Sequence, residues 1–535
     1  MNFDAIHTPY PSRRMTVYGS GGMVCTSQSL AAQAGLDILK KGGNAVDAAI
    51  ATAACKTVLE PTSNGIGGDA FALVWVEGKL HGLNASGPAP AGLSIEAVKG
   101  RGHETMPALG WLPVTVPGAP AAWAELSRRF GKLPFADLFE PAIRYAENGY
   151  PVAPDLADGW ARTFRRYSEV LQGDEFSEWF RVFAPEGRAP RPGEVWRSPD
   201  HARTLTAIAE SLARAFYEGE LADRIDEASR KTGGLIRKED LAAYKPEWVD
   251  PIGVNYRGYD VWEIPPNGQG LVALMALNIL KGFELGERDS VSTVHRLIEA
   301  TKLAFSDGLA YITDPSRMNV RVEDLLSDAY AEDRRRLIGR EAVVPAPGHP
   351  PRSGTIYLAT ADGQGGMVSF IQSNYAGFGS GIVIPGTGIA LQNRGADFSL
   401  DPGKANSLEP GKKTYHTIIP GFITKDGEPV GPFGVMGGYM QPQGHVQVVS
   451  SMIDFGLSPQ AALDAPRWQW ISGRKVMLEH AFPEPVAKSL ARMGHEVQWA
   501  LDHGSFGRGQ IILRGENGVL AGGTEPRADG VVAAW

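Results

Sequence analysis

The sequence lacks the features that define several classes of protein. Its two cysteines, Cys25 and Cys55, allow at most one disulfide in 535 residues, and we expect two buried free thiols instead. No stretch approaches the roughly 20 consecutive apolar residues of a membrane-spanning helix. The N-terminal residues contain no apolar core of the length that a secretory signal needs, so we expect a cytoplasmic protein without a membrane partner.

Positive charge and metal-binding patterns are also scarce. The 52 lysines and arginines are outnumbered by 60 acidic residues, the net charge is −8, and no basic stripe is present to neutralise the phosphates of a nucleic acid. The eleven histidines are scattered, with none in an HExxH pattern or close to a cysteine, so no metal site is predicted. We expect no cofactor. This pattern favours an enzyme that acts on a small molecule.

The residues that are present have an ordinary soluble composition, with 43% hydrophobic and 21% charged residues. The length fits two to four domains or one large layered fold. The first clear element is a helical hairpin. Apolar residues recur at helical spacing over Leu30–Leu39, Gly42 and Gly43 end that helix, and Asn44 is placed to cap a second helix that ends before Pro61.

Further elements follow along the chain. Strands are predicted around Phe71–Val76 and Lys79–Leu83. Helical periodicity predicts helices at Pro120–Phe130, Phe139–Asn148, His201–Tyr217, Val291–Ile312, His445–Phe455 and Pro485–Met493. Residues 340–354, "REAVVPAPGHPPRSG", combine prolines and glycines without periodicity and predict a loop. No internal repeat is present.

A β-hairpin is predicted directly after this loop. Thr355–Ala361 and Met367–Ser373 are β-rich runs joined by "DGQGG". If Ala361 pairs with Met367, the numbers of paired residues sum to 728 and Thr355 lies opposite Ser373. Cross-strand neighbours have Cβ atoms about 4.5–5.5 Å apart, so two hydroxyl groups would stand side by side. A slip of one residue would separate them.

Thr355 is therefore a candidate nucleophile. A free N-terminal threonine carries its own base, because its α-amino group, with a pKa of about 8, can accept the hydroxyl proton directly or through water. Cleavage after Gly354 would create that amine and divide the chain into segments 1–354 and 355–535, which would stay packed as one fold. Taken alone, a threonine that opens a β-strand is common and predicts no catalysis.

Other motifs change that interpretation. Spread over nearly the whole chain, and in the family's order, are stretches that resemble the γ-glutamyltransferase family: "GGNAVDAAIA", "EPTSNGIGGDAF", "VPGAPAAW", "GTIYLATAD", "GFGSGI", "LQNRGADFSLDPG", "GVMGGYMQPQGHVQVV" and "GGTEPRADG". The resemblance implies an α+β fold, the four-layer αββα sandwich of N-terminal-nucleophile hydrolases, and a proenzyme that cleaves itself.

The resemblance also implies roles for single residues. Thr355 matches the nucleophile, and Ser373 stands where the family usually has a second, supporting threonine. Gly437 and Gly438 match the paired glycines whose N–H groups form the oxyanion hole, a kind of donor that typically contributes about 3–4 kcal/mol. Asp397 matches the acidic residue that binds the α-ammonium group of the substrate, although a structural turn aspartate is an equal alternative.

The sequence departs from the family at the remaining recognition positions. The arginine that clamps the substrate carboxylate is missing, and Ser86 stands near its place. His416 and Thr417 replace a serine pair, Tyr375 replaces an asparagine, and Arg394 replaces a glutamine. These changes resemble the branch that contains glutaryl and cephalosporin acylases. Arg394 either neutralises Asp397 or faces an acidic end of the substrate.

Three functions remain open at this point. The first is a self-processing γ-glutamyltransferase-like enzyme that cleaves γ-glutamyl or related amides, or transfers their acyl groups, through a threonyl ester. The second is a glutaryl or cephalosporin-type acylase, and the third is a binding protein that never matures. The segments would stay associated, and a homo-oligomer is compatible with each. The glycine pattern at 268–273 does not indicate a nucleotide site, because helix follows where a second β-strand should be.

Overall fold

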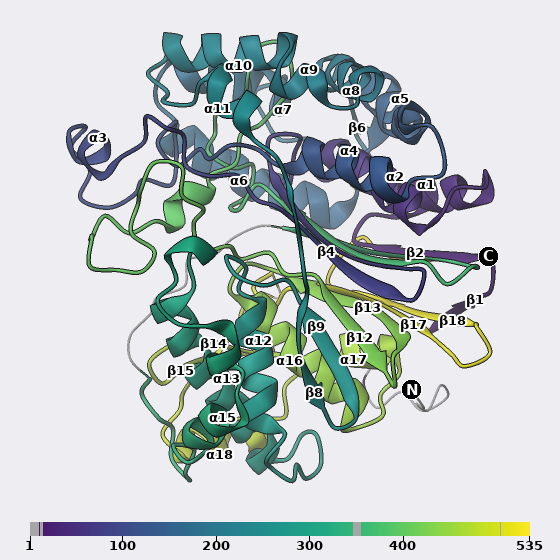
Figure 1. Cartoon of the computed structure of the whole chain (residues 1–535), viewed down its shortest axis with the longest axis vertical. Helices are drawn as coiled ribbons and strands as arrows, with labels where there is room; N and C mark the ends of the chain where they lie inside the picture. Colours follow the sequence, from purple (N-terminus) through teal and green to yellow (C-terminus); the bar gives the residue numbers. More distant parts are fainter. Residues whose placement is uncertain (1–9, 11–13, 346–354, 503) are drawn as a thin grey trace.

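The computed structural model describes residues 10, 14–345, 355–502 and 504–535. Two seven-stranded antiparallel sheets form its centre (Figure 1). In spatial order, the first sheet contains β19 (Val531–Ala534), β2 (Gly22–Thr26), β10 (Ile356–Asp362), β11 (Met367–Ser373), β3 (Asp69–Val76), β4 (Lys79–Ala85) and β7 (Glu247–Val249). The second sheet contains β1 (Val17–Gly19), β18 (Leu520–Thr524), β17 (Arg508–Arg514), β13 (Glu428–Met436), β12 (Gly421–Lys425), β9 (Tyr259–Glu263) and β8 (Ile252–Tyr256).

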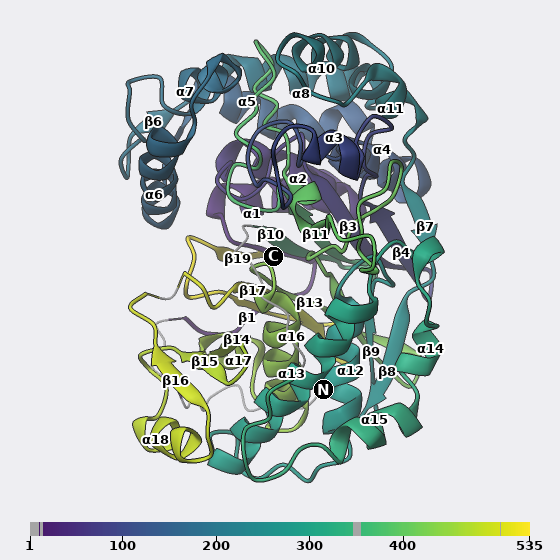
Figure 2. The ribbon, with the colours of Figure 1, turned by 90° about the vertical axis from the view of Figure 1, so that its left-hand side faces the viewer.

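Helices cover the outer face of each sheet (Figures 1 and 2). Over the first sheet lie α1 (Ser29–Lys40), α2 (Ala45–Leu59), α3 (Ile95–Lys99), α4 (Ala119–Phe130), α5 (Glu140–Asn148), α6 (Pro154–Val170), α7 (Ser177–Phe183), α8 (Pro199–Ser211), α9 (Arg214–Tyr217), α10 (Glu220–Lys231) and α11 (Lys238–Ala243). Over the second lie α12 (Gly270–Leu280), α13 (Val291–Tyr311), α14 (Val322–Leu325), α15 (Asp328–Arg335), α16 (Met440–Ile453), α17 (Pro459–Asp464) and α18 (Glu484–Arg492). The predicted αββα sandwich is confirmed.

Two small sheets lie outside these layers. One joins β14 (Trp468–Ser472), β15 (Lys475–Leu478) and β16 (Glu496–Trp499) on the α18 side, and the other pairs β5 (Tyr150–Pro151) with β6 (Val195–Trp196).

The central strands are buried on both faces, as a sheet inside a four-layer fold requires. Along β10, Ile356 and Leu358 belong to the core beneath the helices, whereas Tyr357 and Ala359 belong to the core between the two sheets. A Cβ atom at Gly434 in β13 would lie 2.5 Å from the ring of Tyr357, so this glycine lets the two sheets approach closely at the middle of the molecule.

The predicted helical hairpin is confirmed as α1 and α2. Asn44 caps α2 through its side chain, which accepts hydrogen bonds from the N–H groups of Val46 and Asp47, each at 3.0 Å. Asp47 accepts the N–H of Asn44 in return, which completes a capping box. Between the helices Gly42 has φ +96°, a conformation that favours glycine.

One predicted helix is interrupted in the structure. The run His201–Tyr217 forms two helices, α8 and α9, because Leu212 and Ala213 take left-handed conformations with φ of 51° and 64°. Residues 340–345 form a loop, as predicted, and the rest of that segment, including Gly354, lies outside the described residues.

The two cysteines are free and buried, as predicted. Burial raises the pKa of both thiols far above the ordinary range. Within the described part of the chain, no helix combines the length and the apolar character needed to cross a membrane.

Candidate active site

The hairpin of β10 and β11 places the predicted hydroxyl pair. Its ladder runs from Ala361 opposite Met367 to Ile356 opposite Gln372, so the predicted register is confirmed. Thr355 directly precedes β10, and its Oγ1 lies 3.0 Å from the Oγ of Ser373, within hydrogen-bond distance. Both residues are fully buried.

The end of β11 is held by its neighbours. The Oγ of Ser373 accepts a hydrogen bond of 2.8 Å from the N–H of Tyr375, which has φ +74°. Such a conformation is unusual for a bulky side chain and is common at functional sites. Gly68 permits this turn, because a Cβ atom there would lie 2.5 Å from the carbonyl oxygen of Ser373.

The paired glycines lie at the end of β13, directly before α16. Gly437 and Gly438 have φ of +139° and +62°. Neither donates its N–H to another residue in the described part of the chain. Gly434, three residues before this pair on the same strand, packs on Tyr357 of β10. Free N–H groups before a helix are suited to bind a developing negative charge.

Arg394 and Asp397 form a buried charged pair on one short 3₁₀ turn (Arg394–Asp397). The Nη1 of Arg394 lies 3.6 Å from Oδ2 of Asp397 and donates to Oγ1 of Thr417 at 2.7 Å. Its guanidinium stacks on the ring of Tyr375, with the carbon of the group 4.3 Å from the ring centroid. Burial lowers the pKa of Arg394.

Several polar atoms of this pair have no hydrogen-bond partner in the described residues: Nε and Nη2 of Arg394 and Oδ2 of Asp397. The other oxygen of Asp397 accepts hydrogen bonds from the hydroxyls of Tyr375 at 2.6 Å and Tyr439 at 3.1 Å. Burial raises the pKa of Asp397 to about 6, although Arg394 opposes the shift. Unsatisfied buried polar atoms are costly, and here they indicate a place for a polar ligand.

His416 has a different environment from the one predicted. Its Nε2 lies 2.9 Å from Oδ2 of Asp69, and its Nδ1 accepts the N–H of Ile418 at 3.4 Å. Burial holds the pKa of His416 well below its usual value and raises that of Asp69 to about 7. Both ring nitrogens therefore have protein partners, so the imidazole orients Asp69, whose backbone is paired with Ser373 in the sheet.

Ser86 lies in a buried amide network. Its hydroxyl donates to Oδ1 of Asn84 at 2.7 Å and accepts from Nδ2 of Asn267 at 3.2 Å. The place near which the resemblance expects a cationic clamp is thus filled by neutral hydrogen-bonding groups.

Sequence reasoning missed two residues of this site. Tyr439 donates a hydrogen bond to Asp397. Its position directly after the predicted oxyanion-hole residue Gly438 was the sequence feature that could have indicated it. Asn374 follows Ser373, is fully buried, and has no hydrogen-bond partner for either side-chain polar atom among the described residues.

A surface cavity of about 320 Å³ leads to the glycine pair. Its walls include Gly437, Gly377, Arg508 and Asp529, whereas Thr355 is not among them. Thr355 is fully buried.

Comparison with known proteins agrees with this geometry. Residues 31–535 match the family model described as gamma-glutamyltranspeptidase. The chain is 38% identical over 526 residues to a glutathione hydrolase-like proenzyme, YwrD, of Bacillus subtilis, with 96% of this chain and 98% of that one covered. It is 36% identical over 527 residues to an oxamate amidohydrolase proenzyme of Klebsiella pneumoniae, with the same coverage.

A solved structure is also similar. The crystal structure of a cephalosporin acylase from Bacillus halodurans superposes with a TM-score of 0.96 at 64% sequence identity, covering 100% of this chain and 99% of that one. The fold, the match along the chain and the hydrolase relatives together make this protein an enzyme, a hydrolase of the N-terminal-nucleophile type. The chain belongs to the γ-glutamyltranspeptidase family.

Proposed function

We propose that this protein is a self-processing amidohydrolase. The chain is cut between Gly354 and Thr355 into segments 1–354 and 355–535, and the new N-terminus of Thr355 is the catalyst. The observation that carries this proposal is the 3.0 Å contact between the hydroxyls of Thr355 and Ser373 at the start of a buried strand. The proenzyme names of the relatives support it.

The cycle has two steps. The Oγ1 of Thr355 attacks the amide carbonyl while its α-amine takes the hydroxyl proton, and the N–H groups of Gly437 and Gly438 stabilise the oxyanion. The C–N bond breaks, the leaving amine takes the proton, and an ester remains on Thr355. Water, or an acceptor amine, then attacks the ester and releases the acyl group. The hydrogen bond between the hydroxyls of Ser373 and Thr355 orients the nucleophile.

The acyl group carries a carboxylate at its far end, as a glutaryl group does. Arg394 supports this assignment, because Nε and Nη2 are buried, lack partners among the described residues, and form the fork that binds a carboxylate with two hydrogen bonds. Thr417 and the ring of Tyr375 hold the guanidinium in place. In this assignment Tyr375 and Thr417 line the substrate site. His416 orients Asp69, which is paired with Ser373 in the sheet, and so acts on the site indirectly.

A γ-glutamyl group is the second candidate, and one observation favours it. The Oδ2 of Asp397 has no hydrogen-bond partner among the described residues and is available to an α-ammonium group. A γ-glutamyl chain would place its carboxylate against Arg394 and its ammonium against Asp397. The glutaryl chain leaves Asp397 as the counter-ion of Arg394 alone.

Intact-mass measurement tests the proposal first. The purified protein should give two fragments broken before Thr355, and Thr355→Ala should give one chain of 535 residues. Glutaryl and γ-glutamyl p-nitroanilides then compare the two acyl groups, with kcat/KM expected to be higher for glutaryl. A single uncut chain from both preparations would refute the self-made nucleophile and leave a binding protein.

A further inference from the structure

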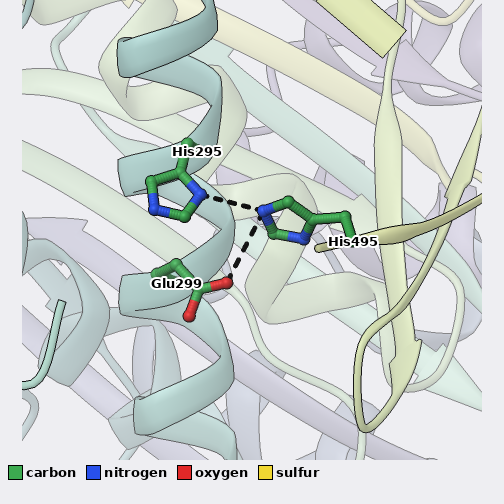
Figure 3. A group of neighbouring side chains, drawn as sticks. All are labelled: His295, Glu299 and His495. Atoms are coloured by element: carbon green, nitrogen blue, oxygen red, sulfur yellow. Dashed lines mark hydrogen bonds and ion pairs between the residues drawn. The ribbon is translucent and has the colours of Figure 1, made fainter. Parts of the chain in front are cut away.

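A second cluster of reactive side chains shares no residue with the candidate active site. His295 and Glu299 lie one turn apart on α13, and His495 precedes β16 (Figure 3). The Nδ1 of His295 lies 2.9 Å from Nε2 of His495, and that nitrogen lies 3.7 Å from Oε1 of Glu299. One nitrogen or oxygen atom from each residue lies within 4.8 Å of the other two, and all three residues are buried.

We propose that His295, Glu299 and His495 form a binding site for a divalent transition-metal ion of the zinc type. Two imidazoles and one carboxylate are a common ligand set for zinc. At bond lengths of about 2.0–2.1 Å, tetrahedral geometry separates ligand atoms by about 3.3 Å. Two of the three separations, 2.9 and 3.7 Å, lie on either side of this value, and the third does not exceed 4.8 Å, so side-chain rotations would bring the three atoms to one ion.

Outer contacts orient the three ligands toward one point. The Nε2 of His295 faces the carbonyl oxygen of Gly339 at 3.2 Å, which leaves Nδ1 directed at the centre of the cluster. The Oε2 of Glu299 accepts the N–H of Val343 at 3.0 Å, which leaves Oε1 directed inward.

Lys302 is the competitor for this site. Its Nζ donates to Oε1 of Glu299 at 2.6 Å and lies 3.5 Å from Nδ1 of His495. Without an ion, the lysine and the imidazoles therefore form a hydrogen-bonded chain that ends at Gly339. The carbonyl oxygen of Val343, 3.4 Å away, gives the ammonium group another acceptor when Glu299 turns to the ion. Removal of the lysine charge should strengthen metal binding.

The location gives the ion a structural role. His295 and Glu299 precede the proposed cleavage position, and His495 follows it, 200 residues from His295. Gly339 and Val343, which contact the cluster, lie near the end of the first segment. If the chain is cut as proposed above, the ion links the two segments and fixes the end of the first.

Metal binding is measured on the full-length Thr355→Ala protein, so that the result does not depend on cleavage. After dialysis against a chelator, Zn²⁺ is titrated by calorimetry, and Co²⁺ is added to record visible d–d absorption. We expect one ion per chain and an intense tetrahedral Co²⁺ spectrum. His295→Ala and His495→Ala should each weaken binding by about 100-fold or more, whereas Lys302→Met should strengthen it.

His480→Ala is the matched control, because His480 is exposed and lies outside the cluster. It should leave affinity and spectrum unchanged. Circular dichroism and thermal unfolding test whether each variant is folded. If His495→Ala does not fold, His495→Gln replaces it. Absence of binding in the parent protein, or equal affinity in the folded histidine variants, would overturn the proposal and leave a hydrogen-bonded tie between α13 and the loop at 339–343.

Discussion

Arg394→Ala tests how the acyl group is recognised. The change removes the two unpartnered donors, Nε and Nη2, that we assign to the substrate carboxylate. A hydrogen bond to a charged group contributes about 1.5–3 kcal/mol, so two contribute about 3–6 kcal/mol. Since about 1.4 kcal/mol corresponds to a factor of ten, kcat/KM for a glutaryl anilide should fall by about 100- to 10,000-fold. Asp397, left unpaired beside the substrate carboxylate, adds to the loss.

The assay compares two acyl groups of equal length. Glutaryl p-nitroanilide carries the terminal carboxylate and pentanoyl p-nitroanilide does not, so only the first should lose activity in the variant. Arg394→Lys should recover part of the loss, because lysine keeps the charge but not the planar fork. Arg321→Ala is the control, since that side chain is 76% exposed and paired only with a surface aspartate. An equal fall for both anilides in cleaved, folded Arg394→Ala would refute the assignment.

Three further predictions concern the reaction itself. Ser373→Ala should slow both self-cleavage and anilide turnover by about 10- to 100-fold, while Ser373→Thr should retain most activity; intact mass and kcat are the measurements. Gly437→Ala should lower kcat by about 100-fold or more in a chain that is still folded. A side chain would shift the backbone N–H from its position, because the residue has φ of +139° and an added Cβ atom would lie 3.0 Å from Gly507. The pKa of Asp397, about 6, predicts that KM for a γ-glutamyl anilide rises as the pH falls below 6, since the carboxylate is then protonated, whereas KM for the glutaryl anilide does not rise in parallel. If KM rose in parallel for both anilides as the pH falls, and both rises disappeared in Asp397→Asn, the ammonium site would be contradicted.

Local signals predicted much of the fold. The β-rich runs of β10 and β11 and the length of the glycine turn between them were enough to predict the pairing register, because turn length fixes which residues face each other. Asn44 was enough to mark the start of α2, because its side chain caps that helix in a way that depends on neighbouring residues only.

Features that depend on distant contacts were not predictable in this way. The break between α8 and α9 falls at Leu212 and Ala213, two residue types that rarely adopt the left-handed conformation, so no typical turn residue marks it. The active-site roles were proposed from a family resemblance, but the orphaned atoms of Arg394 are visible only in the folded packing. His495 reaches α13 across 200 residues, a separation that no motif spacing covers.

The strand order of the two sheets has a consequence for refolding. In the first sheet, β10 and β11 lie between β2 and β3, and β19 lies beyond β2. In the second sheet, the run from β18 to β12 lies between β1 and β9. A cut before Thr355 would therefore leave each sheet with strands from both segments, so that neither segment contains a complete sheet. If the chain is cut as proposed, the uncut protein should refold at a rate independent of concentration, whereas the unfolded cleaved protein requires association of its two segments, so its recovery should depend on protein concentration.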